Sequence, residues 1–136
     1  MVERPTILVI EDYSDTRMLL SSFLRAHGFK VIEARDGKEG FIQANRVIPD
    51  LILMDLALPE MDGVETTRRI RQRHALSKIP VFAISAYATN DVARDAIEAG
   101  CTEVFGKPFE AELLLKRIHA NLGWKSMRIQ GTAGAS

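Results

Sequence analysis

The sequence has one cysteine, Cys101, among 136 residues, which excludes an internal disulfide framework. No apolar run approaches the ~20 residues that a membrane-spanning helix requires. The first residues, Met1 to Pro5, lack the long apolar core of a signal peptide. Lys plus Arg equal Asp plus Glu at 18 each, so no overall attraction to nucleic acid or an anionic membrane is indicated. We therefore expect a cytoplasmic protein without membrane insertion or direct nucleic-acid binding.

The length fits one domain with a substantial core. Short apolar segments alternate along the chain with segments of helical periodicity. Each crossover between parallel strands needs a helix, so this alternation predicts a doubly wound α/β sandwich with a five-stranded parallel sheet and five helices. The segments expected to form strands are 6–10, 29–34, 51–55, 79–84 and 102–105.

Caps, glycines and prolines indicate where the helices begin and end. The signals are Gly28 after the first helix, Asp36 and Pro49 around the second, an Asp62–Glu65 capping box before the third, Gly100 after the fourth, and Pro108 and Gly123 around the fifth. In the first helix, apolar residues recur at helical spacing at Met18, Leu19, Phe23 and Leu24. In the fifth, Leu113, Leu114, Ile118 and Leu122 are expected to face the core.

Polar side chains stand where four of the predicted strands end: Glu11 and Asp12, then Asp55, Ser85 and Lys107. Ligands bind at the carboxyl ends of strands in an open parallel sheet, so we expect these groups to form one site. Crowded carboxylates repel one another unless a cation lies among them. The ligands are all oxygens, without His or Cys, which favours a hard ion such as Mg²⁺. An Asp beside such an ion can attack a phosphoryl group, and Lys107 and Ser85 can then meet the phosphoryl oxygens.

The motifs at these strand ends resemble those of the receiver family of response regulators. They are Val9–Asp12, Met54–Pro59 with Met61–Gly63, Ile84–Ala86 and Lys107–Phe109, and the likeness extends from Thr6 to about Leu122. Each motif alone is weak evidence, but all of them in the right order at the right strand ends are strong evidence. The resemblance implies a flavodoxin-like sandwich with the strand order 2-1-3-4-5.

The resemblance also implies a role for each matching residue. Asp55 would be the phosphoacceptor, and Mg²⁺ would be held by Asp12, Asp55 and the backbone carbonyl of Ala57, with Glu11 binding it through water. Ser85 would bond the phosphoryl group and move toward it as a switch residue. Lys107 would pair with the phosphoryl group, and the Lys107–Pro108 peptide would be cis.

Two positions, 104 and 87, bear on how this chain would compare with the family in signalling. The family usually has Tyr or Phe three residues before the conserved Lys, whereas this chain has Val104. Phe105 is expected to point to the opposite face of its strand and so not to replace that ring. Tyr87 occupies a position that influences phosphoryl hydrolysis in the family, and its bulk suggests a long-lived phosphoform.

We expect residues 1–123 to form a receiver domain and residues 124–136 a short, flexible tail without an output domain. The resemblance then implies a stand-alone response regulator of a two-component system or phosphorelay. A sensor histidine kinase or a histidine phosphotransfer protein would donate the phosphoryl group, and the phosphoform would bind a downstream target protein. The protein would be no conventional enzyme, although it would promote its own phosphorylation and autodephosphorylation. It would be a monomer or a weak homodimer.

Two other functions are compatible with parts of this pattern. A dehalogenase-like hydrolase or phosphatase also uses an Asp nucleophile beside Mg²⁺. Such enzymes carry Asp-x-Asp after the first strand and an additional cap domain, whereas this chain has Glu11-Asp12-Tyr13 and 136 residues. A receiver-like scaffold that works without phosphorylation is the main alternative, and Val104 is the residue that favours it.

The remaining conspicuous residues have structural explanations. Cys101 follows a helix-ending glycine and is expected to be a buried apolar side chain. The three histidines lack ligand spacing. The arginine-rich segment of the third helix is expected to be a solvated face, with a partner-docking or anion-binding patch as the alternative; it contains Arg68, Arg69, Arg71, Arg73 and His74.

Overall fold

The computed structural model describes residues 4–58 and 61–123, and the tail predicted for 124–136 lies outside them. These residues form the five-stranded, all-parallel sheet that the sequence predicts, with the order β2-β1-β3-β4-β5 that the resemblance implies. The strands are β1 (Thr6–Ile10), β2 (Lys30–Ala34), β3 (Leu51–Asp55), β4 (Val81–Ser85) and β5 (Glu103–Gly106).

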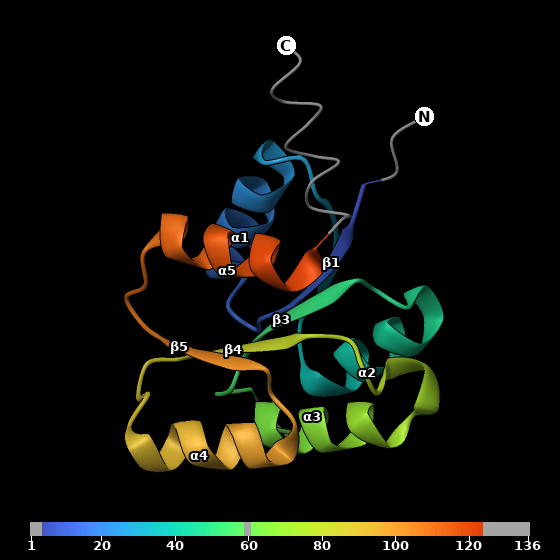
Figure 1. Cartoon of the computed structure of the whole chain (residues 1–136), viewed down its shortest axis with the longest axis vertical. Coiled ribbons are helices and arrows are strands. Elements are labelled where there is room, and N and C mark those ends of the chain that lie inside the picture. Colours follow the sequence, from blue (N-terminus) through green and yellow to red (C-terminus); the bar gives the residue numbers. More distant parts are fainter. Residues whose placement is uncertain (1–3, 59–60, 124–136) are drawn as a thin grey trace.

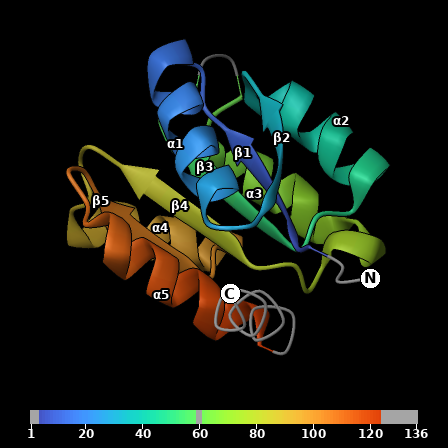
Figure 2. The same ribbon diagram turned by 90° about the horizontal axis from the view of Figure 1, so that it is seen from above.

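Helices cover both faces of the sheet, as Figures 1 and 2 show. The helices α1 and α5 lie on one face, and α2, α3 and α4 lie on the other. This is the doubly wound arrangement that right-handed parallel crossovers produce. The helix bounds are α1 (Ser14–Ala26), α2 (Gly37–Val47), α3 (Gly63–Gln72), α4 (Asn90–Ala99) and α5 (Ala111–Leu122), and a short 3₁₀ helix, η1, covers His74–Leu76.

Each face of the sheet has its own hydrophobic core. All side chains of β3 and β4 are buried, as expected for central strands that are covered on both faces. Toward α1 and α5, the core includes Val9, Phe82, Leu114 and Ile118. Toward α2, α3 and α4, it includes Leu8, Ile52, Met54, Ala83 and Cys101. Cys101 is therefore the buried side chain that the sequence predicts.

The predicted caps explain why most helices begin and end where they do. Asp36 accepts a hydrogen bond from the Glu39 N–H at 2.8 Å, and Asp62 accepts one from the Glu65 N–H at 2.8 Å. The helix α4 ends at Gly100, whose φ of 117° lies in the left-handed region that favours glycine.

Several helix predictions are wrong in detail. Pro108 does not lie in the first turn of α5, because the chain runs on to Glu110 before the helix begins. Leu113, which the sequence predicts to face the core, is 48% exposed. In α1, Met18 and Leu19, for which the sequence predicts only helical spacing, are 60% and 73% exposed. Only the side of each helix that faces the sheet is buried. Apolar residues at the margins of that side therefore remain in solvent.

Arg71 also departs from its prediction as part of a solvated face. Its Nε donates to the Gly100 carbonyl at 2.9 Å, and its Nη1 donates to the carbonyls of Leu76 at 3.0 Å and Ser77 at 3.2 Å. These carbonyls belong to the end of α4 and to η1 with the residue after it. Arg68 and Arg69, by contrast, are exposed and pair with Glu65. Arg71 therefore links α3 to its neighbours.

Candidate functional site

Four strands place polar residues at one edge of the sheet. Asp55 is the last residue of β3 and Ser85 the last of β4, while Glu11 directly follows β1 and Lys107 directly follows β5. The register pairs Asp55 with Ile84 and Ser85 with Gly106, so the ends of β3, β4 and β5 lie side by side. The predicted convergence of these residues is what the fold produces.

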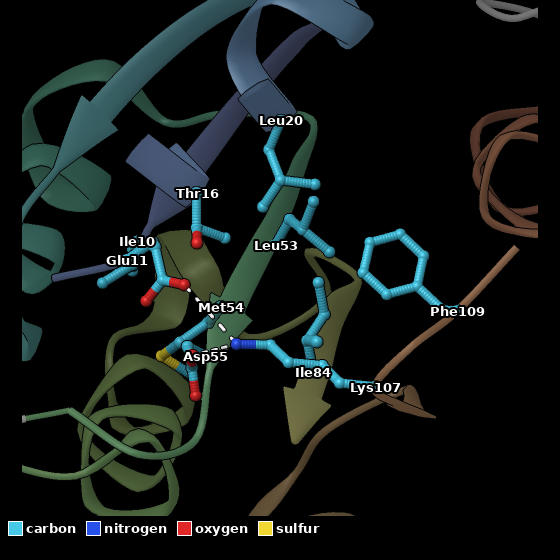
Figure 3. A pocket seen from close by; sticks show the side chains of 10 residues that line it. All are labelled: Ile10, Glu11, Thr16, Leu20, Leu53, Met54, Asp55, Ile84, Lys107 and Phe109. Carbon is cyan, nitrogen blue, oxygen red and sulfur yellow. Dashed lines mark hydrogen bonds and ion pairs between the residues drawn. The ribbon is translucent and has the colours of Figure 1, made fainter. Parts of the chain in front are cut away.

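Lys107 lies between two buried carboxylates (Figure 3). Its Nζ is 2.7 Å from Asp55 Oδ2 and 3.6 Å from Glu11 Oε1. Asp55 is 8% exposed and Glu11 is 3% exposed, so both carboxylates are largely removed from water. The ammonium group is their nearby compensating charge, because buried charges require a partner.

Glu11 and Lys107 both have raised pKa values, but for different reasons. Burial and the charge of Asp55 raise the pKa of Glu11 to about 7, although Lys107 acts in the opposite direction. Burial alone would lower the pKa of Lys107, but the hydrogen bond and charge of Asp55, with a contribution from Glu11, raise it. Lys107 therefore remains a cation at neutral pH, whereas Glu11 takes up a proton easily.

The two loops beside Asp55 are held by local hydrogen bonds. The Ala57 N–H donates to Asp55 Oδ1 at 2.8 Å, which fixes the carboxylate against the β3–α3 loop. In the β4–α4 loop, the Tyr87 N–H donates to Ser85 Oγ at 3.1 Å. The Tyr87 side chain is 78% exposed. The Lys107–Pro108 peptide is cis, as the resemblance implies.

Val104 and Phe105 point to opposite faces of β5, as predicted. Val104 packs on the core toward α2, α3 and α4. Phe105 belongs to the other core, where its ring centroid is 5.4 Å from that of Phe82. Phe105 therefore does not replace the aromatic ring that the family usually has at position 104.

The family profile described as "Response regulator receiver domain" matches residues 7–119 of the chain. The chain belongs to the response regulator receiver family. This receiver is 34% identical over 117 residues to the chemotaxis protein CheY of Bacillus subtilis, covering 85% of this chain and 96% of that protein. It is 31% identical over 118 residues to the polar-differentiation response regulator DivK of Brucella ovis, covering 87% of this chain and 96% of DivK.

Solved receiver structures share the fold closely. The receiver domain of the sensor histidine kinase PA1611 from Pseudomonas aeruginosa has a TM-score of 0.83 and 30% identity, and the match covers 89% of this chain and 99% of that chain. That structure is described with a magnesium ion coordinated in the active-site cleft. Chemotaxis protein CheY4 of Vibrio cholerae matches with a TM-score of 0.84 and 26% identity, and the match covers 88% of this chain and 100% of that chain.

The oxygen groups at the receiver's rim fit a hard cation. Glu11 Oε2 is buried without a hydrogen-bond partner, and burial together with the nearby Asp55 charge raises the pKa of Glu11. Over residues 4–58 and 61–123, no three acidic, His or Cys side chains form a closed metal cluster. An ion here would therefore need backbone carbonyl, water or phosphoryl oxygens as well, which is the mixed coordination that Mg²⁺ favours.

A cavity of about 10 Å³, which has room for about one water molecule, lies among the side chains labelled in Figure 3. Thr16 from α1 and Phe109 after β5 line it together with Glu11, Asp55 and Lys107. The sequence gave no indication of Thr16, because a single hydroxyl in a first helical turn resembles an ordinary surface residue. Asp12 is exposed at the rim.

In the part of the chain that the structure describes, no helix is long and apolar enough to cross a membrane.

Proposed function

We propose that this receiver is a stand-alone response regulator that accepts a phosphoryl group on Asp55. The observation that carries the proposal is the contact of Lys107 Nζ with Asp55 Oδ2 at 2.7 Å beside buried Glu11. An ammonium group bound to a carboxylate at a strand end is placed to meet the oxygens of a phosphoryl group that arrives there. Residues 1–123 would form the receiver domain.

The chemistry follows from the groups at the rim. An Asp55 carboxylate oxygen attacks the phosphorus of a phosphohistidine donor, the new O–P bond forms as the N–P bond breaks, and the donor imidazole keeps the electron pair. Lys107 and the Ser85 hydroxyl then stabilise the negative phosphoryl oxygens. Asp12, Asp55, the Ala57 carbonyl and, through water, Glu11 would hold Mg²⁺, which supplies further positive charge to those oxygens. Hydrolysis of the acyl phosphate would return the receiver to its starting state.

Ser85 connects this chemistry to the protein surface. Its Oγ accepts the Tyr87 N–H in the structure, so turning the Ser85 side chain toward a phosphoryl group would remove a restraint on the β4–α4 loop. Such a change can bias an equilibrium between two conformations of the loop and α4, which a target protein reads. The donor would be a sensor histidine kinase or a histidine phosphotransfer protein. We place the receiver in the cytoplasm as a monomer or a weak homodimer.

Intact-mass spectrometry after incubation with acetyl phosphate tests the proposal. We expect one added phosphoryl group in the wild type with Mg²⁺, and none with excess chelator or in Asp55→Asn. Asp91→Asn is the matched control, because Asp91 lies on α4 with its side chain 82% exposed. A wild type without adduct, even when sampled within seconds, would contradict the proposal.

A phosphorylation-independent scaffold is the second candidate, and the observation that favours it is Val104 at the position of the usual aromatic ring. Without that ring, one way for a movement of Ser85 to change the outer face of the domain is missing. Target capture that is equal for the wild type and Asp55→Ala, with and without acetyl phosphate, would support the scaffold over the switch.

A further inference from the structure

The turn between β1 and α1 carries the acids Glu11 and Asp12, and α1 begins without a side-chain cap, like α5 and unlike α2, α3 and α4. Side chains cap α2, α3 and α4, through Asp36, Asp62 and Thr89. The corresponding residue of α1, Tyr13, makes no side-chain cap hydrogen bond. An uncapped first turn leaves backbone groups beside the rim without local support.

Arg17, one turn into α1, restrains this turn instead. Its Nη1 donates to the Glu11 carbonyl oxygen at 2.8 Å, and its Nε donates to Glu33 Oε1 on β2 at 3.2 Å. The Arg17 side chain is only 14% exposed, so these bonds are partly protected from water. Its backbone N–H also donates to the Tyr13 carbonyl at 2.9 Å. One residue thus connects the end of β1, the start of α1 and the neighbouring strand.

Both backbone groups of Glu11 are held as a result. Its N–H donates to the carbonyl of Ala34, at the end of β2, at 3.0 Å. Its carbonyl accepts from Arg17. The peptide that joins Glu11 to Asp12 is planar, so fixing its carbonyl sets the direction in which the chain, and with it Asp12, continues.

We propose that Arg17 is a positioning residue for the cation site, which holds the acidic turn so that Asp12, and Glu11 through water, can bind Mg²⁺ together with Asp55. The inference rests on the proposed function, because it assumes that these acids receive the ion. Arg17 would touch neither the ion nor the phosphoryl group, because its side chain bonds to Glu33 and to the Glu11 carbonyl. It acts through the peptide of Glu11.

Glu33 makes this arrangement compatible with a nearby cation. A guanidinium close to the acids would repel Mg²⁺, but the Glu33 carboxylate neutralises it at 3.2 Å. Glu33 also pairs with Arg25 Nη2 at 3.4 Å, and the Arg25 side chain is 52% exposed. Arg25 shares the partner of Arg17 but bonds to Val31 rather than to Glu11, which makes it the matched control.

The test is the Mg²⁺ dependence of phosphorylation by acetyl phosphate, with Mg²⁺ binding measured by calorimetry on the unphosphorylated protein. Losing a group that orients metal ligands typically costs 10–100-fold in metal affinity. For Arg17→Ala we expect the half-saturating Mg²⁺ concentration to rise about tenfold, with the maximal rate at saturating Mg²⁺ within about twofold of wild type. Arg17→Lys, which can still donate to the Glu11 carbonyl, should recover part of the affinity, and Arg25→Ala should match wild type.

Three outcomes overturn the inference. The first is Arg17→Ala with wild-type Mg²⁺ dependence while Asp55 is phosphorylated normally, which leaves the proposed function intact. The second is an equal loss in Arg25→Ala, which would show a general effect through Glu33. The third is a maximal rate that falls while the half-saturating concentration stays constant. If Arg17→Ala does not fold, Arg17→Lys carries the comparison. If the wild type takes no phosphoryl group, the proposed function fails, and calorimetry alone decides whether Arg17 supports cation binding.

Discussion

Glu11 and Asp55 are two buried carboxylates that share one ammonium group. Lys107 approaches Asp55 more closely, at 2.7 Å against 3.6 Å for Glu11, so Glu11 has the weaker partner. Its Oε2 atom is buried without a hydrogen bond. A proton on Glu11, or a cation bound beside it, would relieve the same excess of negative charge.

The raised pKa of Glu11 predicts how stability depends on pH when Mg²⁺ is absent. The folded protein holds the Glu11 proton up to about pH 7, whereas the unfolded chain releases it near 4.5. The stabilisation of the folded state by the Glu11 proton is therefore fully present below pH 4.5 and is lost as the pH rises through about 7. The shift corresponds to at most about 3 kcal/mol in the free energy of unfolding.

Urea unfolding between pH 5 and pH 8 in the presence of chelator measures this effect. We expect the wild type to lose stability across this range relative to Glu11→Gln, which cannot titrate at that position. Identical pH profiles for the two proteins would contradict the prediction.

At the scale of helices and strands, Arg71 joins three segments that are separated in the sequence. It lies on α3 and donates hydrogen bonds to the end of α4, to η1 and to the residue after η1. A Cβ added at Gly100 would lie 2.6 Å from Arg71 Cγ, so the absence of a side chain at position 100 makes room for this link. Because α4 follows the Ser85 loop, the link anchors the far end of the helix that the proposed switch would move.

Arg71→Ala should lower the free energy of unfolding by about 2 kcal/mol, since it leaves several carbonyl groups without a charged donor. Arg69→Ala, which removes an exposed pair with Glu65 on the same helix, should change it by less than about 0.5 kcal/mol. Chemical denaturation of both variants gives the comparison. Equal losses would show that the hydrogen bonds of Arg71 do not stabilise the fold.

For the molecule as a whole, Mg²⁺ that binds only the folded receiver should stabilise it by mass action. At an Mg²⁺ concentration about a hundred times its Kd, the free energy of unfolding should rise by about 3 kcal/mol. Asp55→Asn should lose most of this increase while remaining folded. A Tm that does not respond to Mg²⁺ in the wild type would contradict a folded-state cation site.

The strands and the site were largely predictable because both depend on local sequence. A buried parallel strand is a short apolar run, and the residue that follows it lies at the binding edge whatever the rest of the fold does. Strand β1 was predicted to the residue, and Asp55, Ser85 and Lys107 were placed at the correct strand ends.

Other features depend on contacts between distant segments and were missed. The exposure of Leu19 follows from how α1 sits on the sheet, which helical periodicity does not define. Arg71 resembles its neighbours in a basic helix, and only its contact with Gly100, which lies 29 residues later, distinguishes it. The reach of Arg17 back to Glu11 has no sequence signature of its own, because its acceptor is a backbone carbonyl.

Both ends of the described domain lie at the edge of the sheet opposite the carboxyl ends of the strands (Figure 1). Strand β1 starts at that edge with Thr6, and α5 runs back to it, ending at Leu122. A fluorescent protein, an affinity tag or a surface tether attached beyond either end would therefore stand away from the rim. The fold thus offers two attachment points for biosensors or immobilised assays that leave the approach to Asp55 and Lys107 open.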